Sequence, residues 1–306
     1  MKDLIIIGAG PAGLSAAIYG LRSGLDLVMV EKLAPGGQVM STYEVENYPG
    51  FVDPVAGWEL MSRMENQARR LGAEIVCGDV VSIDRNAASG ILALTMADGS
   101  SMEAKTVIAA TGASYRKLKV PGEVEHIGHG VSYCATCDGA FFKDRVCAVV
   151  GGGDTALEEA HFLTRFARKV YLIHRRDSLR GAKILQDRIF ANDKIEPVLD
   201  TIVESIDGGT KVENLALKNV KTGNQYMLAV EGVFIFVGFV ANTDYLPAAI
   251  LDENREVIID INMRTNIPGL FAAGDLRSGS KRQIVMAAAE GATAALEAYE
   301  YILGLT

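Results

Sequence analysis

Runs of apolar, mostly β-branched residues recur along this chain, and each stops at a glycine or a polar residue. Leu4–Ile7, Val146–Val150 and Val170–Ile173 carry no charged side chain. Uninterrupted apolar runs of this length are typical of strands buried on both faces of a parallel sheet. Past Pro11, leucine, alanine and isoleucine recur at helical spacing. The pattern therefore predicts a strand, a tight turn and a helix at the start of the chain.

The same plan of strands occurs twice. The segment from Ile91 to Gly112 predicts a strand, a turn and a further strand that ends in an apolar run, and the segment from Leu215 to Gly238 repeats this order. Each half is therefore expected to be a parallel sheet with a small antiparallel excursion over one face. Because glycine ends each apolar run, the backbone there can approach a nucleotide, with Thr111 beside the first of these glycines.

The tail of the chain does not follow the second half by pattern. Residues 267–275 predict a short strand that ends at a glycine and an acid, and residues 283–302 predict an alanine-rich helix. Since a short strand cannot stand alone, we expect it to return to the first sheet. The first domain is then discontinuous (residues 1–115 and 244–306), and the second (residues 116–243) is an insertion.

Composition and charge narrow the possible partners. With 306 residues, 49% of them hydrophobic, the chain is long enough for two folded domains. A formal net charge of −8 argues against nucleic acid and anionic lipid as partners. The uncharged stretch from Leu4 to Leu21 has the length of a membrane span, but glycines and Pro11 interrupt it, so no membrane insertion is expected. Four cysteines are too few for a secreted disulfide framework, which favours the cytoplasm.

The first glycine-rich turn has the spacing that cradles a pyrophosphate. Gly8 permits a tight bend, Gly10 lets the backbone approach the phosphates, and Gly13 lets helix and strand pack closely, while the helix start offers N–H groups to an anion. Glu31 ends the next strand, where its carboxylate can accept hydrogen bonds from ribose hydroxyls. The predicted contacts within this turn are Gly8, Gly10, Pro11, Ala12 and Gly13.

A second glycine-rich turn repeats this logic, but it leads to a basic segment. Its predicted contacts are Gly151, Gly153, Asp154 and Thr155. The next strand runs into His174, Arg175 and Arg176, with Arg180 four residues on, where the first module has an acid. Arginine pairs bidentately with phosphate and stays charged, so this cluster predicts a 2′-phosphate and hence NADPH over NADH. The alternative is a solvated, basic start of a helix.

Cys134 and Cys137 form a CxxC motif followed by Asp138. Such a pair can be half of a zinc site, a redox pair or two buried thiols. Zinc needs two further ligands, and no metal is expected, because Cys77 and Cys147 lack suitable spacing and are both expected to be structural. Two intervening residues put both sulfurs within reach of a disulfide, and Gly130 and Gly139 leave the turn open for exchange, so the redox interpretation is preferred. Asp138 either caps or turns the chain, or its carboxyl moves the proton that dithiol formation demands.

These motifs together resemble those of the low-molecular-weight, bacterial-type thioredoxin reductases over essentially the whole chain. The resemblance rests on GAGPAG (8–13), GGQ (36–38), ENYPG (46–50), CATCD (134–138), GGGDTA (151–156), HRRD with Arg180, and the segment from AGD to RQ (273–283). The fold that it implies is α/β, with two Rossmann-like three-layer domains, the second inserted into the first. Asp154 departs from the asparagine that relatives often carry.

The resemblance also implies cofactors, residue roles and partners. FAD would lie in the discontinuous domain and NADPH in the inserted one, which would rotate between two positions, and the chain would form a homodimer. Cys134 would attack the disulfide of thioredoxin, Cys137 would face the flavin, and Asp138 would be the acid. Besides the first turn, the residues implied to line FAD are Glu31, Lys32, Gly36, Gly37, Gln38, Asn47, Thr111, Gly112, Asp275, Arg282, Gln283 and Ile284.

Other functions remain open at this point. A flavoprotein that feeds a peroxiredoxin system carries an additional N-terminal thioredoxin-like region, which we do not expect because the first strand is predicted from Asp3 or Leu4. A dithiol oxidase that makes small-molecule disulfides with oxygen would not need the arginine cluster. A flavin-bound redox sensor is an alternative from outside the enzymes.

Overall fold

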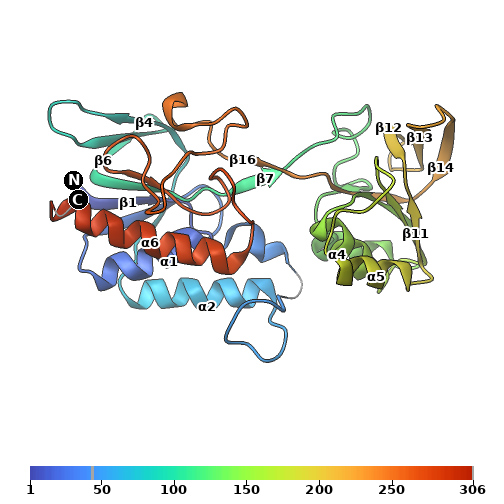
Figure 1. Ribbon diagram of the computed structural model, residues 1–306, viewed down its shortest axis with the longest axis horizontal. Coiled ribbons are helices and arrows are strands. Elements are labelled where there is room, and N and C mark those ends of the chain that lie inside the picture. The colour runs from blue at the N-terminus through green and yellow to red at the C-terminus, as the bar shows by residue number, and fades with distance from the viewer. Residues whose placement is uncertain (43–44, 305–306) are drawn as a thin grey trace. The chain divides into compact units, whose positions relative to one another are not determined.

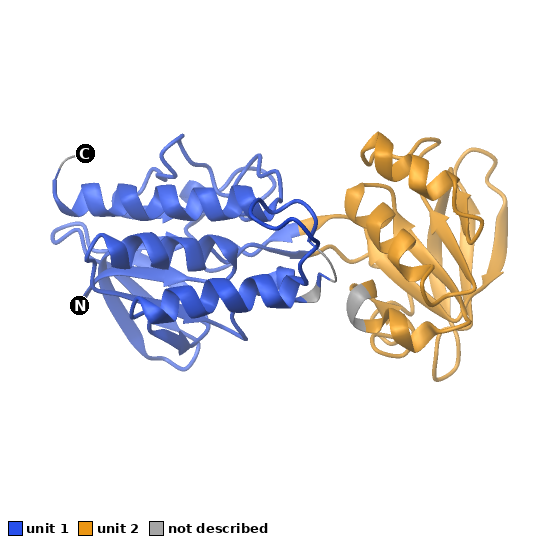
Figure 2. Ribbon diagram, turned by 90° about the horizontal axis from the view of Figure 1, so that it is seen from below, with its two compact units in different colours: residues 1–114, 240–306 blue, residues 115–239 orange. Residues whose placement is uncertain are grey.

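The computed structural model describes residues 1–42 and 45–304, without the side chains of Ser41, Thr136 and Cys137. It divides into two compact units, unit 1 (residues 1–114 and 240–306) and unit 2 (residues 115–239), coloured separately in Figure 2. The sequence had placed the return to the first domain at residue 244. Residues 240–243 belong to unit 1 because Asn242 donates to the carbonyl oxygen of Thr111 (2.9 Å) and Thr243 donates to that of Arg255 (2.7 Å).

Unit 1 is built on a sheet with strand order β3-β2-β1-β6-β5-β4, in which β17 also pairs with β6. Strands β1, β2, β3 and β17 run parallel to their neighbours, whereas β4 and β5 are antiparallel. The predicted return of the tail to the first sheet is thus confirmed. The strands are β1 (Lys2–Ile7), β2 (Leu27–Glu31), β3 (Ile75–Cys77), β4 (Val80–Arg85), β5 (Leu92–Met96), β6 (Ser101–Ala109) and β17 (Leu270–Ala272).

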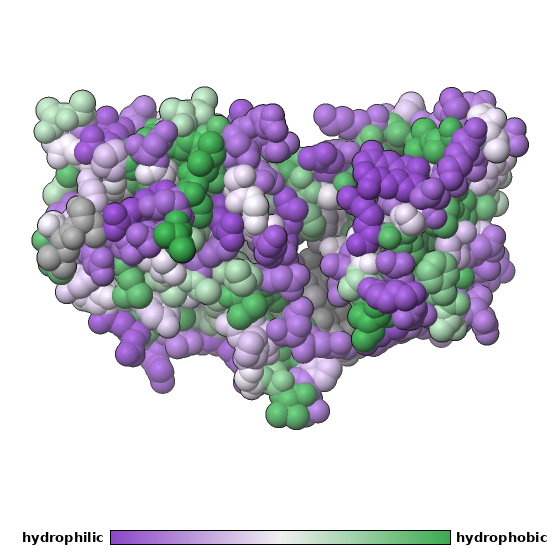
Figure 3. All heavy atoms as spheres, in the orientation of Figure 1, coloured by the Kyte–Doolittle hydropathy of each residue, from purple (hydrophilic) through white to green (hydrophobic). Residues whose placement is uncertain are grey.

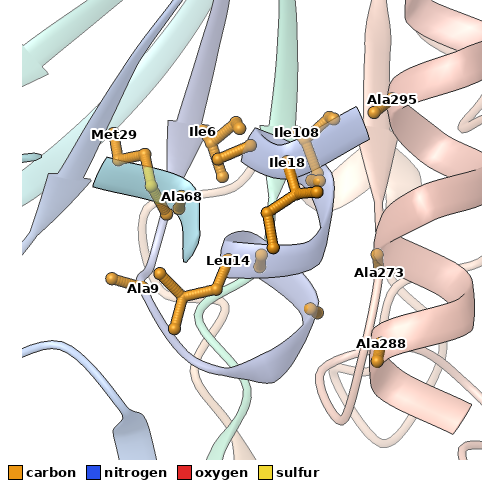
Figure 4. Packing of buried hydrophobic residues seen from close by; sticks show 14 of the residues in the cluster. Ile6, Ala9, Leu14, Ile18, Met29, Ala68, Ile108, Ala273, Ala288 and Ala295 are labelled. Atoms are coloured by element: carbon orange, nitrogen blue, oxygen red, sulfur yellow. The ribbon is translucent and has the colours of Figure 1, made fainter. Parts of the chain in front are cut away.

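Helices cover one face of this sheet. The helical elements of unit 1 are α1 (Pro11–Arg22), α2 (Gly57–Arg70) and α6 (Ile284–Ile302), with the short 3-10 turns η1 (Gly37–Ser41) and η3 (Ala248–Ile250). Helix α1 packs against both α2 and α6, as Figure 1 shows. Leu14 and Ile18 of α1 belong to the same buried cluster as Ala288 and Ala295 of α6 (Figure 4). Small residues let these two helices approach closely.

The apolar run of β1 is explained by burial on both faces. Leu4 and Ile6 point into the core under the helices, whereas Ile5 and Ile7 point into a second core on the other side of the sheet. That second core contains residues from the segment after the inserted unit, including Leu246, Ile250, Val257 and Leu276. The sequence predicts an antiparallel excursion over one face of this sheet, and for unit 1 that prediction is wrong. Strands β4 and β5 extend the main sheet through β6 and do not form a covering layer.

Unit 2 also has a parallel sheet with helices on one face, and a separate antiparallel sheet covers its other face. Its parallel sheet has the order β11-β10-β9-β15-β8, and β12, β13 and β14 form an antiparallel sheet. Val149 and Leu172 face the helices, while Val150 and Ile173 face the antiparallel strands. The elements are β8 (Val131–Ser132), α3 (Ala135–Asp138), η2 (Gly139–Phe142), β9 (Val146–Gly151), α4 (Asp154–Leu163), β10 (Lys169–Ile173), α5 (Lys183–Phe190), β11 (Ile195–Val198), β12 (Thr201–Asp207), β13 (Asn214–Asn219), β14 (Gln225–Ala229) and β15 (Gly232–Phe236).

The chain passes between the units in two strands that pair with each other, β7 (Ala113–Tyr115) and β16 (Phe239–Ala241). At the surface, polar and apolar residues are interspersed on the face that Figure 3 shows. Within the described ranges, no helix has the length and apolar character needed to cross a membrane. The overall class is the predicted α/β fold.

Candidate functional site

The first glycine turn joins β1 to α1 in the geometry that the sequence predicts. Gly8 has a φ of +101°, and a Cβ there would lie 2.4 Å from the carbonyl oxygen of Ala110. A Cβ on Gly13 would lie 1.9 Å from the carbonyl oxygen of Gly8. Around Gly10, in contrast, a Cβ would meet no described protein atom within 4 Å. Gly8 and Gly13 are thus required by packing, whereas Gly10 faces open space where a ligand can approach.

The start of α1 suits an anion. Gly10 is the N-cap, Pro11 follows it, no side chain caps the helix, and the first turn contains no acidic residue. The free N–H groups and the positive end of the helix dipole therefore remain available. Glu31, predicted to meet ribose, accepts hydrogen bonds from the N–H groups of Ala9 (2.7 Å) and Leu33 (3.0 Å). These bonds fix the carboxylate beside the turn.

Residues that are distant in sequence converge on this turn. The N–H of Gly36 donates to the carbonyl oxygen of Ala9 (2.8 Å), and a Cβ on Gly37 would lie 3.4 Å from the Cα of Gly10. A Cβ on Gly274 would lie 3.0 Å from the Cβ of Ala12. The predicted segments 8–13, 36–37 and 274–275 therefore meet at one edge of unit 1.

Other predicted FAD contacts are held by the chain itself. Gln38 donates to the carbonyl oxygen of Ala113, and Asn47 donates to the side chain of Gln283 (3.0 Å). The hydroxyl of Thr111 donates to the carbonyl oxygen of Asn242 (2.7 Å). Gly112 has a φ of +63° with open space around it, and Ile284 begins α6.

The two basic side chains among the predicted FAD contacts form ion pairs with carboxylates of the chain. Lys32 forms an ion pair with Asp79 (2.7 Å), and Arg282 forms one with Glu256 (2.9 Å). Arg282 has a φ of +52°. Contributions of these two side chains to cofactor binding remain predictions.

Asp275 lies in a network that the sequence did not reveal. Burial raises the pKa of its carboxyl, although the hydroxyl of Ser280 donates to it at 3.1 Å. Next to it, the buried Glu290 of α6 accepts the N–H of Gly274 (2.8 Å) and pairs with the guanidinium of Arg277. Glu290 therefore attaches the turn that carries Asp275 to α6. No local pattern marks this buried acid within an alanine-rich helix.

The second glycine turn, between β9 and α4, is constrained by different neighbours. A Cβ on Gly151 would lie 2.4 Å from the carbonyl oxygen of Phe236, and one on Gly152 would lie 2.4 Å from the ring of His174. Around Gly153, a Cβ would meet no described atom within 4 Å. The side chain of Asp154, in the first turn of α4 with Thr155, accepts the N–H of Ala182 (2.6 Å).

The arginine segment is folded back onto this turn. The N–H of Arg180 donates to the carbonyl oxygen of Gly152 (2.6 Å), and the side chains of Arg175, Arg176 and Arg180 are exposed. Asp177, the acid among them, is paired with Lys221 (3.2 Å), which also pairs with Asp200 (3.2 Å). The structure thus brings the predicted arginines to the glycine turn.

His174 lies beneath the same turn. It is 5% exposed, and its Nε2 has no hydrogen-bond partner among the described residues. Burial lowers the pKa of the imidazole, and the charges of Arg180, Arg176 and Arg175 lower it further. The ring is therefore neutral at pH 7 and supports Gly152 from below.

The CxxC segment is fixed by side chains from two directions. Cys134 is disulfide-bonded, while the side chain of Cys137 lies outside the described part of the chain. The hydroxyl of Ser132 accepts the N–H of Cys134 (3.0 Å) and donates to its carbonyl oxygen (3.1 Å). Glu159 of α4 accepts the N–H of Ala135 (3.0 Å). Asp138 is half-buried and ends α3.

The other cysteines separate into a buried and an exposed thiol. Cys147 is fully buried in β9, as predicted, and burial raises its pKa to about 12. Cys77 was predicted to be structural as well. In the structure, however, Cys77 is exposed at the end of β3. Its sulfur lies 3.9 Å from the carbonyl oxygen of Lys32.

Both turns therefore fit a dinucleotide. Each has one glycine in open space beside an uncapped helix start, and each has packing glycines where any side chain would collide with backbone or a ring. The two turns differ in charge, because an acid follows the first and arginines follow the second.

The sequence matches the pyridine nucleotide-disulphide oxidoreductase family over residues 2–291. It is 48% identical to the thioredoxin reductase of Listeria innocua, in an alignment that covers 98% of this chain and 93% of the relative. The structure resembles the thioredoxin reductase of Lactococcus lactis with a TM-score of 0.96 and 43% identity, over 99% of this chain and 100% of the other. It resembles the T. acidophilum thioredoxin reductase with a TM-score of 0.93 and 33% identity, over 99% of each chain. The chain therefore belongs to the thioredoxin reductases of the pyridine nucleotide-disulphide oxidoreductase family.

Proposed function

We propose that this enzyme reduces the disulfide of thioredoxin with electrons from NADPH, with FAD bound at the first glycine turn and NADPH at the second. The observation that carries the proposal is the disulfide-bonded Cys134 in the same unit as a glycine turn overlaid by exposed arginines. When bound, FAD supplies a redox centre that accepts a hydride from reduced nicotinamide and delivers two electrons to a disulfide.

The chain's own residues carry out the exchange. In the dithiol form, the thiolate of Cys134 attacks one sulfur of the thioredoxin disulfide, and the other thioredoxin sulfur leaves as a thiolate and takes up a proton. The thiolate of Cys137 then attacks Cys134 in the mixed disulfide, which reforms the enzyme disulfide and releases the second thioredoxin thiol. Two electrons and two protons pass to thioredoxin, and Asp138 is the proposed acid that moves a proton.

Support for NADPH comes from charge at the second turn. Arg175 and Arg176 follow β10, and the backbone N–H of Arg180 donates to the carbonyl oxygen of Gly152. The intervening Asp177 is paired with Lys221. A divalent phosphate placed there meets guanidinium groups that no described carboxylate pairs with. NADH lacks this group, so the arginines favour NADPH.

The partners are proposed from membership of the family. Thioredoxin or a thioredoxin-like protein is the proposed substrate, and a homodimer in the cytoplasm is the proposed state of the enzyme. Reduction of a peroxiredoxin system and oxidation of small dithiols with oxygen are the alternatives.

Substitution of the redox cysteines tests the proposal. Cys134→Ser and Cys137→Ser are each expected to retain the yellow flavin and to lose NADPH-dependent reduction of thioredoxin, because each removes one sulfur of the exchange. Absorbance of the flavin in the visible range should bleach with NADPH in the wild-type enzyme and recover with oxidised thioredoxin. Unchanged turnover in either variant contradicts the assignment, and oxygen consumption that outpaces thioredoxin reduction favours the oxidase.

Substitution of the arginines tests the choice of nucleotide. Arg176→Ala is expected to lower kcat/KM for NADPH by about 10-fold to 100-fold, since a charge-assisted hydrogen bond contributes about 1.5–3 kcal/mol. The value for NADH should change little. Equal losses with both nucleotides would indicate a structural role for the arginine.

A further inference from the structure

Glu159 lies beside the backbone of the CxxC segment, although nothing in the sequence marks it. It extends from α4, the helix that follows the second glycine turn, and its carboxylate accepts the N–H of Ala135 at 3.0 Å. Ala135 directly follows Cys134 and is fully buried. A negative charge is therefore held against the backbone that carries the attacking cysteine.

The N–H groups at the start of α3 are also occupied. Ser132 accepts the N–H of Cys134 at 3.0 Å, and Glu159 accepts that of Ala135. In many CxxC proteins, free N–H groups in this position stabilise the thiolate of the first cysteine. In this enzyme they are bonded to other acceptors, and one of those acceptors is itself an anion.

We propose that Glu159 is a positioning residue that makes the Cys134–Cys137 pair more strongly reducing. A dithiol becomes a better oxidant when its thiolate is stabilised, because the reduced state is then favoured. Glu159 acts in the opposite direction, since its charge disfavours a thiolate on Cys134. This inference rests on the proposed function, because it concerns the same dithiol.

The consequence concerns the direction of exchange with thioredoxin. The enzyme dithiol is oxidised to the disulfide while the thioredoxin disulfide is reduced to the dithiol, with two electrons and two protons transferred. Because Glu159 destabilises the reduced enzyme relative to the disulfide, it favours release of these electrons to the partner.

The test compares the redox equilibrium of charge variants of the flavin-containing enzyme. Wild type and Glu159→Gln are equilibrated with mixtures of reduced and oxidised dithiothreitol, quenched in acid, and labelled with a maleimide to count free thiols by mass. Glutamine keeps the shape and an acceptor for Ala135 but removes the charge. At about pH 9, where an ordinary cysteine thiol is largely ionised, we expect the equilibrium to move about threefold to tenfold toward the dithiol, where tenfold equals about 30 mV.

Two further variants separate charge from packing. Glu159→Asp keeps the charge and should shift the equilibrium less than Glu159→Gln. Glu196→Gln removes an exposed carboxylate in the same unit, one that pairs with Lys169, and should match wild type. If Glu159→Gln does not fold, Glu159→Ala replaces it, with an expected shift in the same direction.

The outcomes are distinct from those that test the function. A neutral variant at position 159 that matches wild type, or that becomes more reducing, overturns the inference even if thioredoxin is reduced normally. A wild-type enzyme whose disulfide equilibrates with dithiothreitol but is not reduced by NADPH contradicts the proposed function and leaves the equilibrium measurement valid.

Discussion

Glu123 is a buried acidic residue of unit 2 that accepts several hydrogen bonds. Its side chain is fully buried and accepts hydrogen bonds from the N–H groups of Leu118 (2.9 Å) and Lys119 (2.6 Å) and from the hydroxyl of Tyr133 (2.6 Å). Lys119 has a φ of +63°, a conformation that lysine rarely adopts. Burial and the adjacent carboxylate raise the pKa of Tyr133. Glu123 thereby connects the start of unit 2 to the residue before Cys134.

Removal of this carboxylate should be costly. Glu123→Ala leaves two part-buried N–H groups and a phenol without their acceptor, so the free energy of unfolding should fall by about 3 kcal/mol. Urea denaturation monitored by circular dichroism measures the change. Glu125→Gln, at an exposed neighbouring position, is the control and should stay within about 0.5 kcal/mol of wild type. Equal stability of the two variants would show that the network contributes little.

The two free thiols should differ in reactivity. Cys77 is exposed, whereas Cys147 is buried and has a pKa raised to about 12 by burial. Because alkylation requires the thiolate, iodoacetamide at mildly alkaline pH should label Cys77 and leave Cys147 unmodified until the protein is unfolded. Peptide mass spectrometry of native and urea-treated enzyme locates the label. Rapid native labelling of Cys147 would mean that β9 opens readily.

Residue chemistry was predictable where the local pattern contains it. Cys147 was placed inside a strand because apolar residues surround it in sequence, and burial in β9 confirms this. Glu123, Glu159 and Glu290 were not found, because their importance comes from N–H groups supplied by other parts of the fold. Sequence spacing gives no sign of such tertiary contacts.

At the scale of elements, the glycines of the first turn divide into packing and ligand positions. Gly13→Ala places a Cβ 1.9 Å from a carbonyl oxygen of the turn, so it should destabilise the protein by about 3 kcal/mol even without cofactor. Gly10→Ala meets no described atom within 4 Å, and Gly10 has a φ of −78°, which alanine adopts readily. Its stability should match wild type.

The substitution that leaves stability unchanged, Gly10→Ala, should be the one that weakens binding of FAD. Gly10→Ala is expected to bind FAD at least about 10-fold more weakly, because the added methyl group occupies the space through which the phosphates approach the backbone. Unfolding of the flavin-free protein and quenching of flavin fluorescence measure the two effects. If Gly13→Ala bound FAD weakly but kept normal stability, Gly13 would be a ligand position and not a packing position.

The main strands were predictable because each contains an uncharged, apolar run that is buried on both faces of its sheet. The antiparallel strands were harder to place. In unit 1 they extend the sheet through β6, whose first residues pair with β5 and whose last residues pair with β1 and β17. In unit 2 they form a separate sheet over the parallel one. The alternating patterns are alike, so only packing against distant segments distinguishes the two arrangements.

At the scale of the whole molecule, unit 2 is an insertion that can be removed without interrupting the core of unit 1. Each has its own hydrophobic core, and both passages between them run through the paired strands β7 and β16. The N–H of Arg116 donates to the carbonyl oxygen of Gly238 at 2.8 Å, so the two ends of the insertion are neighbours. A short connection can therefore close the gap with little loss of chain entropy.

Replacement of residues 116–238 by two glycines should leave a folded FAD-binding protein. The first glycine turn, Glu31 and the segment around Asp275 all lie in unit 1, so the shortened protein should purify yellow and unfold cooperatively. Without the CxxC and the arginines, it should not reduce thioredoxin with NADPH. Flavin content from the visible spectrum, thermal unfolding and the reductase assay check these expectations, with wild type in parallel. A colourless or unfolded product would mean that FAD binding depends on unit 2, because the remaining core and turn would then be insufficient.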